Sequence, residues 1–285
     1  MPKYVLVTAA KNEEKYIGQT IESVINQTIR PEKWVIVSDS SNDLTDNIVR
    51  KNEINHPWIV LKRKENTEAR NFGAQARAIN WGYESIRDIQ AEFVGNFDAD
   101  ITIEHTYFEQ LIEEFKKNAK LGLAGGYIHE KKNGGFVEDP LNSPDSVAHA
   151  VQLFRKKIFD SIGGYLPMPY GGSDTVAEDM VRMSGYEVKS FKQLIVRHHK
   201  PILSGEGWQK GAIRQGKMDY SIGTHPLFEM FRCLRRIIYG KSRALVVFRI
   251  IGYFMAVVKN EKSSLAPDII KFIRKRQMRK LFGGK

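Results

Sequence analysis

Along the amino-terminal part of this chain, short apolar runs alternate with longer stretches whose apolar residues recur at helical spacing. The runs are rich in β-branched and aromatic residues and are expected to be strands, at residues 4–8, 34–37, 58–61 and 92–97. The stretches between them are expected to be helices, at residues 14–27, 43–53 and 67–86. Such alternation favours a parallel sheet covered by helices on both faces. Because ligands collect at the carboxyl ends of strands in these sheets, the residues that follow each run are the candidates for chemistry.

The pattern is less regular after residue 104. We expect a helix over 104–118, strands over 121–129 and 187–196, and a strand or a strand-helix passage over 147–159. Two segments rich in Gly and Pro, 130–145 and 163–174, are expected to be loops, the second of them mobile. A helix is expected over 177–184, and from residue 203 only helical patterns remain. The sequence therefore predicts an α/β domain over residues 1–202 and a helical region over 203–285.

The positive charge of the chain is confined to its carboxyl-terminal region. The 285 residues carry 44 Lys and Arg against 33 Asp and Glu, a formal net charge of +11. Residues 226–285 hold 15 of the cations and 3 of the acids, so the rest of the chain is close to neutral. A nucleic-acid-binding protein would usually spread its cations over the main domain, and this distribution argues against that class.

Two acids stand directly after the fourth apolar run. Asp98 and Asp100 are two positions apart, so both carboxylates point to one side of an extended chain. Two hard oxygen donors beside a loop suit Mg²⁺ or Mn²⁺ carrying substrate phosphates, although turns and helix caps use the same residues. Asp39 could likewise cap the following helix, and Glu178 and Asp179 could be first-turn acids of a helix.

These features follow one another in a characteristic order. VTAAKNEE is followed by VSDSSNDLT, then by Asn71, Gly73, Ala78, Asn80 and Gly82, then by FDAD and AEDMVRMSGY. In this order the motifs resemble those of family 2 glycosyltransferases of the GT-A fold, over about residues 1–200. The resemblance implies a Rossmann-like, nucleotide-binding mixed α/β sheet flanked by helices, with the basic helical region as an extension. It also implies an inverting, metal-dependent glycosyltransferase.

The resemblance assigns a donor site residue by residue. Ala9 and Glu13 would lie against the nucleotide, and Asp39 would accept a hydrogen bond from the base. Asp98 would lie near the ribose and the metal. Asp100 would hold the divalent cation, Mg²⁺ or Mn²⁺, against the diphosphate.

Further residues complete the implied site. Asp179 would be the catalytic base, because an ionised carboxylate can take the proton of a weakly nucleophilic sugar hydroxyl, and Glu178 would help to place the acceptor. By its spacing His198 matches a downstream metal ligand of this fold, while a surface pair with His199 is the alternative. Apart from the resemblance, Arg70 and Arg214 could contact the donor phosphates, and solvated arginines are the alternative.

The sequence departs from the family's pattern in two places. Ser38-Asp39-Ser40-Ser41 stands where the family usually has Asp-Asp-Gly-Ser, so one acid is missing and the acid matched to the base is kept. The Gln-x-x-Arg-Trp sequence of processive polysaccharide synthases has no counterpart, because the chain contains no Arg-Trp pair. This favours transfer of one sugar to a glycan or a lipid-linked saccharide, in the synthesis of a cell-surface polysaccharide or glycoconjugate.

Two other functions share part of the pattern. A sugar nucleotidyltransferase would have a glycine-rich phosphate loop after the first strand, where this chain has KNEEKYIG. A nucleotide-sugar-binding module without catalysis would not need Asp98, Asp100 and Asp179 together. We therefore expect an enzyme that binds a nucleotide sugar and a saccharide acceptor, and no nucleic acid.

The ends of the chain bear on its location. The amino terminus has no signal-peptide pattern, and the sole cysteine, Cys233, cannot form an internal disulfide, so a cytoplasmic location is expected. Residues 244–258 are apolar except for Arg249 and Gly252, and they are too few to span a bilayer. Flanked by cations, they predict a peripheral position on the inner face of an anionic membrane. A helical appendage packed on the catalytic domain is the alternative.

Overall fold

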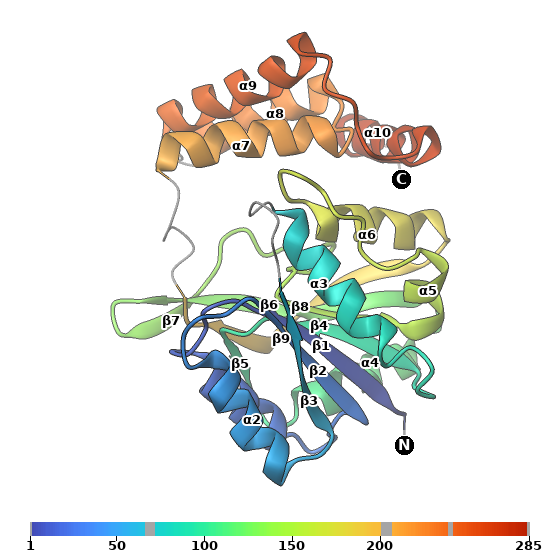
Figure 1. The fold of residues 1–285 in the computed structure, drawn as a ribbon. Coiled ribbons are helices and arrows are strands. Elements are labelled where there is room, and N and C mark those ends of the chain that lie inside the picture. Colours follow the sequence, from blue (N-terminus) through green and yellow to red (C-terminus); the bar gives the residue numbers. More distant parts are fainter. Residues whose placement is uncertain (1, 66–71, 201–206, 239–241, 284–285) are drawn as a thin grey trace.

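A mixed β-sheet between two layers of helices forms the body of the protein, and helices α7 to α10 lie together on one side of it (Figure 1). The structure, a computed structural model, describes residues 2–65, 72–200, 207–238 and 242–283. The strands are β1 (Tyr4–Ala10), β2 (Lys33–Asp39), β3 (Ile59–Lys64), β4 (Phe93–Phe97), β5 (Ile101–Ile103), β6 (Leu121–Lys132), β7 (Gly135–Glu138), β8 (Val151–Arg155) and β9 (Glu187–His198). The helices are α1 (Ile17–Ile25), α2 (Thr45–Asn55), α3 (Gly73–Glu84), α4 (Tyr107–Lys117), α5 (Lys156–Ser161), α6 (Ser173–Met183), α7 (Trp208–Ser221), α8 (Pro226–Ile238), α9 (Arg243–Val258) and α10 (Pro267–Phe282).

β1 is the central strand of the parallel part of the sheet. The strand order is β3-β2-β1-β4-β8-β6-β9-β5, with β7 paired to β6. β1 is parallel to β2 and β4, and β2 is parallel to β3. β8 is antiparallel to both β4 and β6. The expected parallel arrangement is therefore confirmed for β1 to β4, and the complete sheet is mixed.

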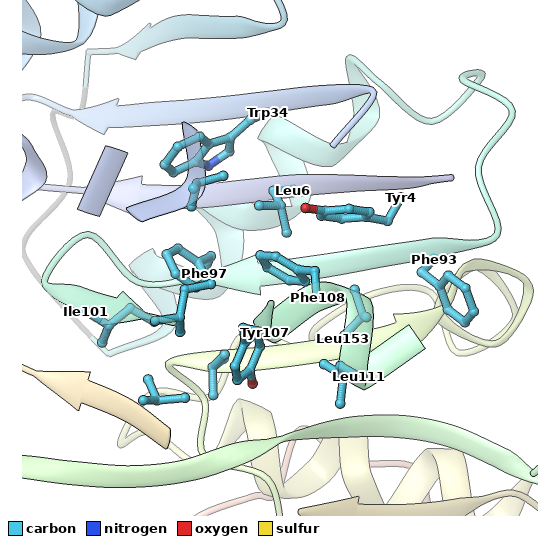
Figure 2. Packing of buried hydrophobic residues seen from close by; sticks show 14 of the residues in the cluster. Tyr4, Leu6, Trp34, Phe93, Phe97, Ile101, Tyr107, Phe108, Leu111 and Leu153 are labelled. Carbon is cyan, nitrogen blue, oxygen red and sulfur yellow. The ribbon is translucent and has the colours of Figure 1, made fainter. Parts of the chain in front are cut away.

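Alternate residues of β1 enter two separate cores. Tyr4 and Leu6 pack with Phe108 on the face covered by α1, α2 and α4 (Figure 2). Val5 and Val7 pack on the opposite face, which α3, α5 and α6 cover. Successive side chains of a strand point to opposite faces, and here helices exclude water from both. This is why the strand sequence is continuously apolar instead of alternating.

Segment 130–145, predicted to be a loop, contains a β-hairpin. β6 extends to Lys132, which pairs with Gly135 at the start of β7. The two residues between them, Asn133 and Gly134, have φ angles of 50° and 82°. A two-residue hairpin turn of type I′ requires positive φ at both positions, and Asn-Gly meets this requirement well. The prediction was wrong because it read these residues as a sign of irregular structure.

Segment 163–174, predicted to be a mobile loop, is packed between the body and the carboxyl-terminal helices. α6 begins inside it at Ser173, before the predicted start at residue 177. The Ser173 hydroxyl accepts a hydrogen bond from the Met168 amide at 3.2 Å, and the Met168 side chain is fully buried. Met168 shares an apolar cluster with Leu265 and with residues of α10. The carboxyl-terminal region is thus packed on the body here. This agrees with the expectation of a helical appendage packed on the catalytic domain.

Two glycines set the separation of α7 and α9. A methyl group at Gly216 would overlap the carbonyl oxygen of Arg249, and one at Gly252 would overlap that of Ile213. Only a residue without a side chain permits two helix backbones to approach so closely. The two helices therefore form one rigid pair.

We expect Gly252→Ala to lower the free energy of unfolding by about 3 kcal/mol, because the methyl group forces α9 away from α7. Urea unfolding followed by circular dichroism measures this change. Gly207→Ala is the control, since no described atom lies within 4 Å of a methyl group placed there. Its effect should stay within about 0.5 kcal/mol. Equal effects of the two variants would contradict the close crossing.

Candidate active site

The loops after β1 and β2 are joined by hydrogen bonds at the carboxyl edge of the sheet. Asn12 and Ser40 both have a φ of 56°, which is uncommon for residues other than Gly. The Asn12 side chain accepts a hydrogen bond from the Asn42 amide at 2.9 Å, and the Asn12 amide donates to the Ser41 hydroxyl at 3.1 Å. A hollow of about 420 Å³ adjoins these loops, and it is lined by Asn12, Glu14, Lys15, Tyr16, Asn42, Asp43 and Lys200.

Ala9 and Asp39 lie at the carboxyl ends of β1 and β2. Ala9 pairs with Val37 in the register of the two strands and is partly exposed. Asp39 is buried. It is not the cap of α2, because Asp43 Oδ1 accepts the hydrogen bond from the Thr45 amide at 3.0 Å. The capping alternative for Asp39 is therefore wrong. Contact of Ala9 and Asp39 with a nucleotide stays a prediction.

Glu13 lies beside a cation from a distant part of the chain. The Lys200 ammonium contacts Oε1, and Oε2 is buried with no hydrogen-bond partner among the described residues. Burial raises the pKa of the Glu13 carboxyl, Lys200 lowers it, and Asp100 and Asp98 raise it, leaving it above its ordinary value. Glu13 thus belongs to the same electrostatic cluster as the Asp-Ala-Asp sequence.

Asp98 faces a histidine that the sequence did not single out. Its Oδ1 accepts a hydrogen bond from Gln75 Nε2 at 3.1 Å and lies 3.7 Å from His149 Nδ1. Burial raises the pKa of the Asp98 carboxyl, but His149, His198 and Asn96 together outweigh this and hold the pKa below its ordinary value. Asp98 is therefore an ionised carboxylate directed towards His149.

Asp100 and His198 form a second polar pair, because β5 and β9 run side by side. His198 Nε2 lies 3.4 Å from Asp100 Oδ2, and its Nδ1 lies 3.0 Å from Glu130 Oε1 on β6. A carboxylate on one ring nitrogen fixes the orientation of the other, which here is directed at Asp100. The His199 amide donates to the Asp100 carbonyl oxygen at 3.0 Å, but its side chain is directed at the Thr102 hydroxyl, 2.8 Å from Nε2. Of the two histidines, only His198 joins the acidic cluster.

The predicted metal-binding set is partly assembled. Asp100 and His198 are adjacent, whereas Asp98 is directed towards His149. Across the ranges that the structure describes, no three His, Cys, Asp or Glu side chains form a group that could hold a metal ion. Mg²⁺ sites that also bind substrate phosphates need only one or two protein carboxylates, and imidazole with carboxylate also suits Mn²⁺. The residues fit a cation site that substrate completes.

Asp179 and Glu178 lie beyond the first turn of α6 and are covered by arginines. Asp179 is 1% exposed, and Arg276 Nη2 of α10 lies 2.7 Å from its Oδ1 and 3.0 Å from its Oδ2. Arg182 Nη1 lies 3.3 Å from Asp179 Oδ1 and 3.2 Å from Glu178 Oε2. Glu178 also accepts a hydrogen bond from the Val147 amide at 2.7 Å. The reading of the two acids as first-turn residues is therefore wrong.

A buried tyrosine connects α6 with the acidic edge of the sheet. Tyr165 lies against His149, with 5.3 Å between the ring centroids. Burial raises the pKa of the Tyr165 hydroxyl, and Asp174, Asp98 and Glu178 raise it further. Two acids of α6, Asp174 and Glu178, and Asp98 after β4 therefore act on one buried side chain.

The structure groups Glu13 with Asp98, Asp100 and His198, and it places Glu178 and Asp179 on α6. The roles of these residues as ligands or as base stay predictions. Arg70 lies outside the described residues. Sequence reasoning missed the partners of these side chains, which are His149, Glu130, Lys200, Arg182 and Arg276. None of them adjoins the motif that it contacts, apart from Arg182, so only the folded chain reveals them.

The chain matches a known family and several characterised relatives. Residues 5–173 match the family described as Glycosyl transferase family 2. Poly-β-1,6-N-acetyl-D-glucosamine synthase of Staphylococcus epidermidis is 30% identical over 204 residues, which cover 64% of this chain and 46% of that protein. Chondroitin synthase of Escherichia coli is 25% identical over 219 residues, covering 72% of this chain and 30% of that protein. The chain thus spans less than half the length of these relatives.

Solved structures show the same fold at low identity. GalNAc-T7 with UDP, GalNAc and Mn²⁺ has a TM-score of 0.62 at 14% identity, covering 92% of this chain and 56% of that chain. Staphylococcus aureus TarS in complex with UDP has a TM-score of 0.59 at 16% identity, covering 99% and 92%. The mannosyltransferase PcManGT of Pyrobaculum calidifontis, with GDP-Man and Mn²⁺, has a TM-score of 0.56 at 14% identity, covering 100% and 76%. The predicted GT-A fold is confirmed.

The environment of Glu178 makes stability depend on pH. Burial raises the pKa of this carboxyl to about 7, although Arg182 and the Val147 amide lower it. The native state then holds a proton that the unfolded state has lost, so stability falls as pH rises from the ordinary pKa towards about 7. We expect Glu178→Gln, which cannot ionise, to gain stability relative to the wild type across this window, by up to about 1.4 kcal/mol per pH unit.

Urea unfolding at about pH 5 and about pH 8 measures the difference. Glu187→Gln is the control, because hydrogen bonds from Lys189 and Asn118 hold the pKa of the Glu187 carboxyl below its ordinary value. Its effect should not change over this window. A pH-independent effect of Glu178→Gln would contradict the assignment.

Proposed function

Because the chain belongs to glycosyl transferase family 2, we propose that it is an inverting glycosyltransferase that moves one sugar from a nucleotide-diphosphate donor to an acceptor hydroxyl. The observation that carries the proposal is the pairing of Asp100 with His198 at the carboxyl edge of the sheet, beside Asp98 and Glu13. The acceptor is a saccharide or a lipid-linked saccharide. The names of the relatives support a place in polysaccharide synthesis.

The donor nucleotide binds at the ends of β1 and β2. The positive φ angles of Asn12 and Ser40 turn both loops away from the strands, and the hydrogen bonds between the loops hold them in place. Asp39 accepts a hydrogen bond from the base, and Ala9 leaves room for the nucleotide because its side chain is small. Arg70 contacts the phosphates. Base recognition by one carboxylate suits uracil, thymine or guanine, each of which has an N–H to donate.

Asp100 and His198 hold a divalent cation, Mg²⁺ or Mn²⁺, with Asp98 beside it. When bound, the cation supplies positive charge that stabilises the leaving diphosphate. Glu130 keeps the His198 ring turned so that Nε2 is directed at Asp100. The presence of Mn²⁺ in the GalNAc-T7 and PcManGT structures supports this choice of ion.

Asp179 accepts the proton of the acceptor hydroxyl, whose oxygen attacks the anomeric carbon from the side opposite the diphosphate. The bond to the diphosphate breaks as the new glycosidic bond forms, so the anomeric configuration inverts. Asp179 is 1% exposed and Arg276 contacts both of its oxygens, so Arg276 has to move for an acceptor hydroxyl to reach the carboxylate. Glu178, held by the Val147 amide and Arg182, supports the position of its neighbour.

Calorimetric titration with UDP, GDP, dTDP and CMP, each with and without Mn²⁺, tests the donor site. We expect one nucleoside diphosphate to bind with a requirement for Mn²⁺, because the clustered acids repel the phosphates until a cation is present. Direct Mn²⁺ binding in the presence of that nucleotide, followed by electron paramagnetic resonance, gives a second readout. Absence of binding by all four, with or without metal, would contradict the proposal.

Two neighbouring histidines provide the matched pair of variants for the same measurement. His198→Ala should weaken Mn²⁺ binding by at least about 10-fold to 100-fold, which is the loss seen when only an outer-shell partner of a metal ligand is removed. His199→Ala removes an identical side chain from the next position, where it contacts Thr102 and not Asp100. It should leave Mn²⁺ binding unchanged. Equal losses would exclude His198 as a specific ligand.

We expect Asp179→Asn to lower the rate of transfer by at least about 100-fold, because the amide cannot accept the proton, with donor binding nearly intact. Mass spectrometry of the product measures transfer and separates single additions from a ladder of chain lengths. A ladder would favour polymer extension, the activity that the relatives' names indicate.

Arg276→Gln is the matched control, because it breaks the same ion pair from the other side and leaves the carboxylate in place. Transfer should then stay within about tenfold of the wild type. Thermal melts of the two variants check that both are folded. A loss with Arg276→Gln as large as with Asp179→Asn would assign the effect to the ion pair and not to a base.

A further inference from the structure

Helix α8 carries its apolar side chains on the outside. The exposed face consists of residues at helical spacing, Leu227, Met230, Phe231, Leu234, Ile237 and Ile238. Phe231 is 57% exposed and Ile238 is 72% exposed. A helix on the surface of a globular protein normally packs its apolar face inwards. In α8 the apolar face is directed outwards. Covering this face with another apolar surface would release water from a large apolar area.

The inner face of α8 is fixed by charges. Glu229 is buried and pairs with Arg232 and with Arg249 of α9, whose Nε lies 2.9 Å from Glu229 Oε1. Both arginines also pair with Asp219 of α7. Removing one partner from a buried network of this kind is strongly destabilising, because it leaves a buried charge without compensation. The helix therefore cannot rotate to bury its apolar face without losing these ion pairs.

Helix α9, which packs against α8, also has exposed apolar side chains. They recur along one face as Val247, Ile251, Phe254, Met255 and Val258. The opposite face, with Gly252 and Tyr253, packs on the neighbouring helices. Among the described residues no helix is both long enough and apolar enough to cross a membrane.

Cations stand at the ends of these apolar faces. Arg243 and Lys259 are exposed at the two ends of α9, and Lys262 follows. Two of the three acids in residues 226–285 have partners in the structure: Glu229 in the buried network, and Glu261 with Tyr170 and Lys217. The outer surface of the region is therefore both apolar and positively charged.

We propose that the outer faces of α8 and α9 dock on an anionic lipid surface. Such a surface offers an apolar interior for Phe231 and Leu234 and negative headgroups for Arg243 and Lys259. A second copy of the chain fits less well, because it would place two regions of equal positive charge against each other. The docked helices would hold the active site at the membrane, where a lipid-linked acceptor is available to the proposed transferase.

Flotation of the full chain with vesicles tests the surface. We expect binding to vesicles that contain phosphatidylglycerol and weak binding to phosphatidylcholine alone. Replacing both Phe231 and Leu234 by Ser should weaken binding by at least about tenfold, because each exposed apolar side chain gains on the order of 1.5 kcal/mol or more on transfer from water. Ile54→Ser on α2 removes a side chain that is 80% exposed on the body, and it should have no effect.

Sedimentation of the same proteins in the absence of vesicles tests the alternative that a second copy of the chain covers this face. Failure of the wild type to bind either vesicle would overturn the proposal, and a dimer abolished by the Phe231 and Leu234 substitutions would assign the face to a second copy. Equal vesicle binding by the wild type and the double variant would leave only electrostatic attraction and would also overturn it. Because Asp179 and Asp100 lie outside this surface, unchanged nucleotide binding by the double variant distinguishes failure of docking from failure of the proposed function.

Discussion

The parallel pairing of β1 with β2 and β4 is the constraint on which the rest of the structure depends. Parallel strands end at the same edge of a sheet, so the loop after β1, the loop after β2 and the Asp-Ala-Asp sequence after β4 meet there. Side chains from both faces of β1 are buried, which fixes the register of the strand. The position of the acidic cluster therefore follows from the packing of two apolar cores.

The acids at the carboxyl edge of the sheet repel one another, and cationic side chains from distant parts of the sequence offset this repulsion. Glu13, Asp98 and Asp100 repel one another, and Lys200, His149 and His198 each lie against one of them. A protein carrying this cluster without substrate needs such partners, because uncompensated buried charge is strongly destabilising. The same groups that stabilise the folded chain are thus the ones that would contact the donor and the cation of the proposed function.

The carboxyl-terminal helices contribute to the body and are also distinct from it. α10 shares an apolar cluster with Met168 and places Arg276 on Asp179, so this part of the region belongs to the candidate site. α8 and α9 instead direct apolar side chains outwards over a buried network of charges. The packing of α10 agrees with one of the two readings of the basic sequence, and membrane contact by α8 and α9 stays a proposal.

The sequence by itself determined the order of elements, the apolar strands and the acids that follow them, because local periodicity and strand-end position are properties of neighbouring residues. It also determined that residues 226–285 are basic. The hairpin at Asn133 and the start of α6 at Ser173 were misjudged where turn residues were taken for irregular structure.

Tertiary structure alone decided which cations meet which acids, which of His198 and His199 joins the cluster, and which face of α8 is exposed. The amphipathic sequence of α8 predicts an apolar face and a polar face, but it does not determine which of the two is buried. Arg276 and Asp179 lie 97 residues apart, and their contact depends on how α10 packs against α6. Such pairings are set by the free energy of the whole packed chain, and no local pattern of residues contains them.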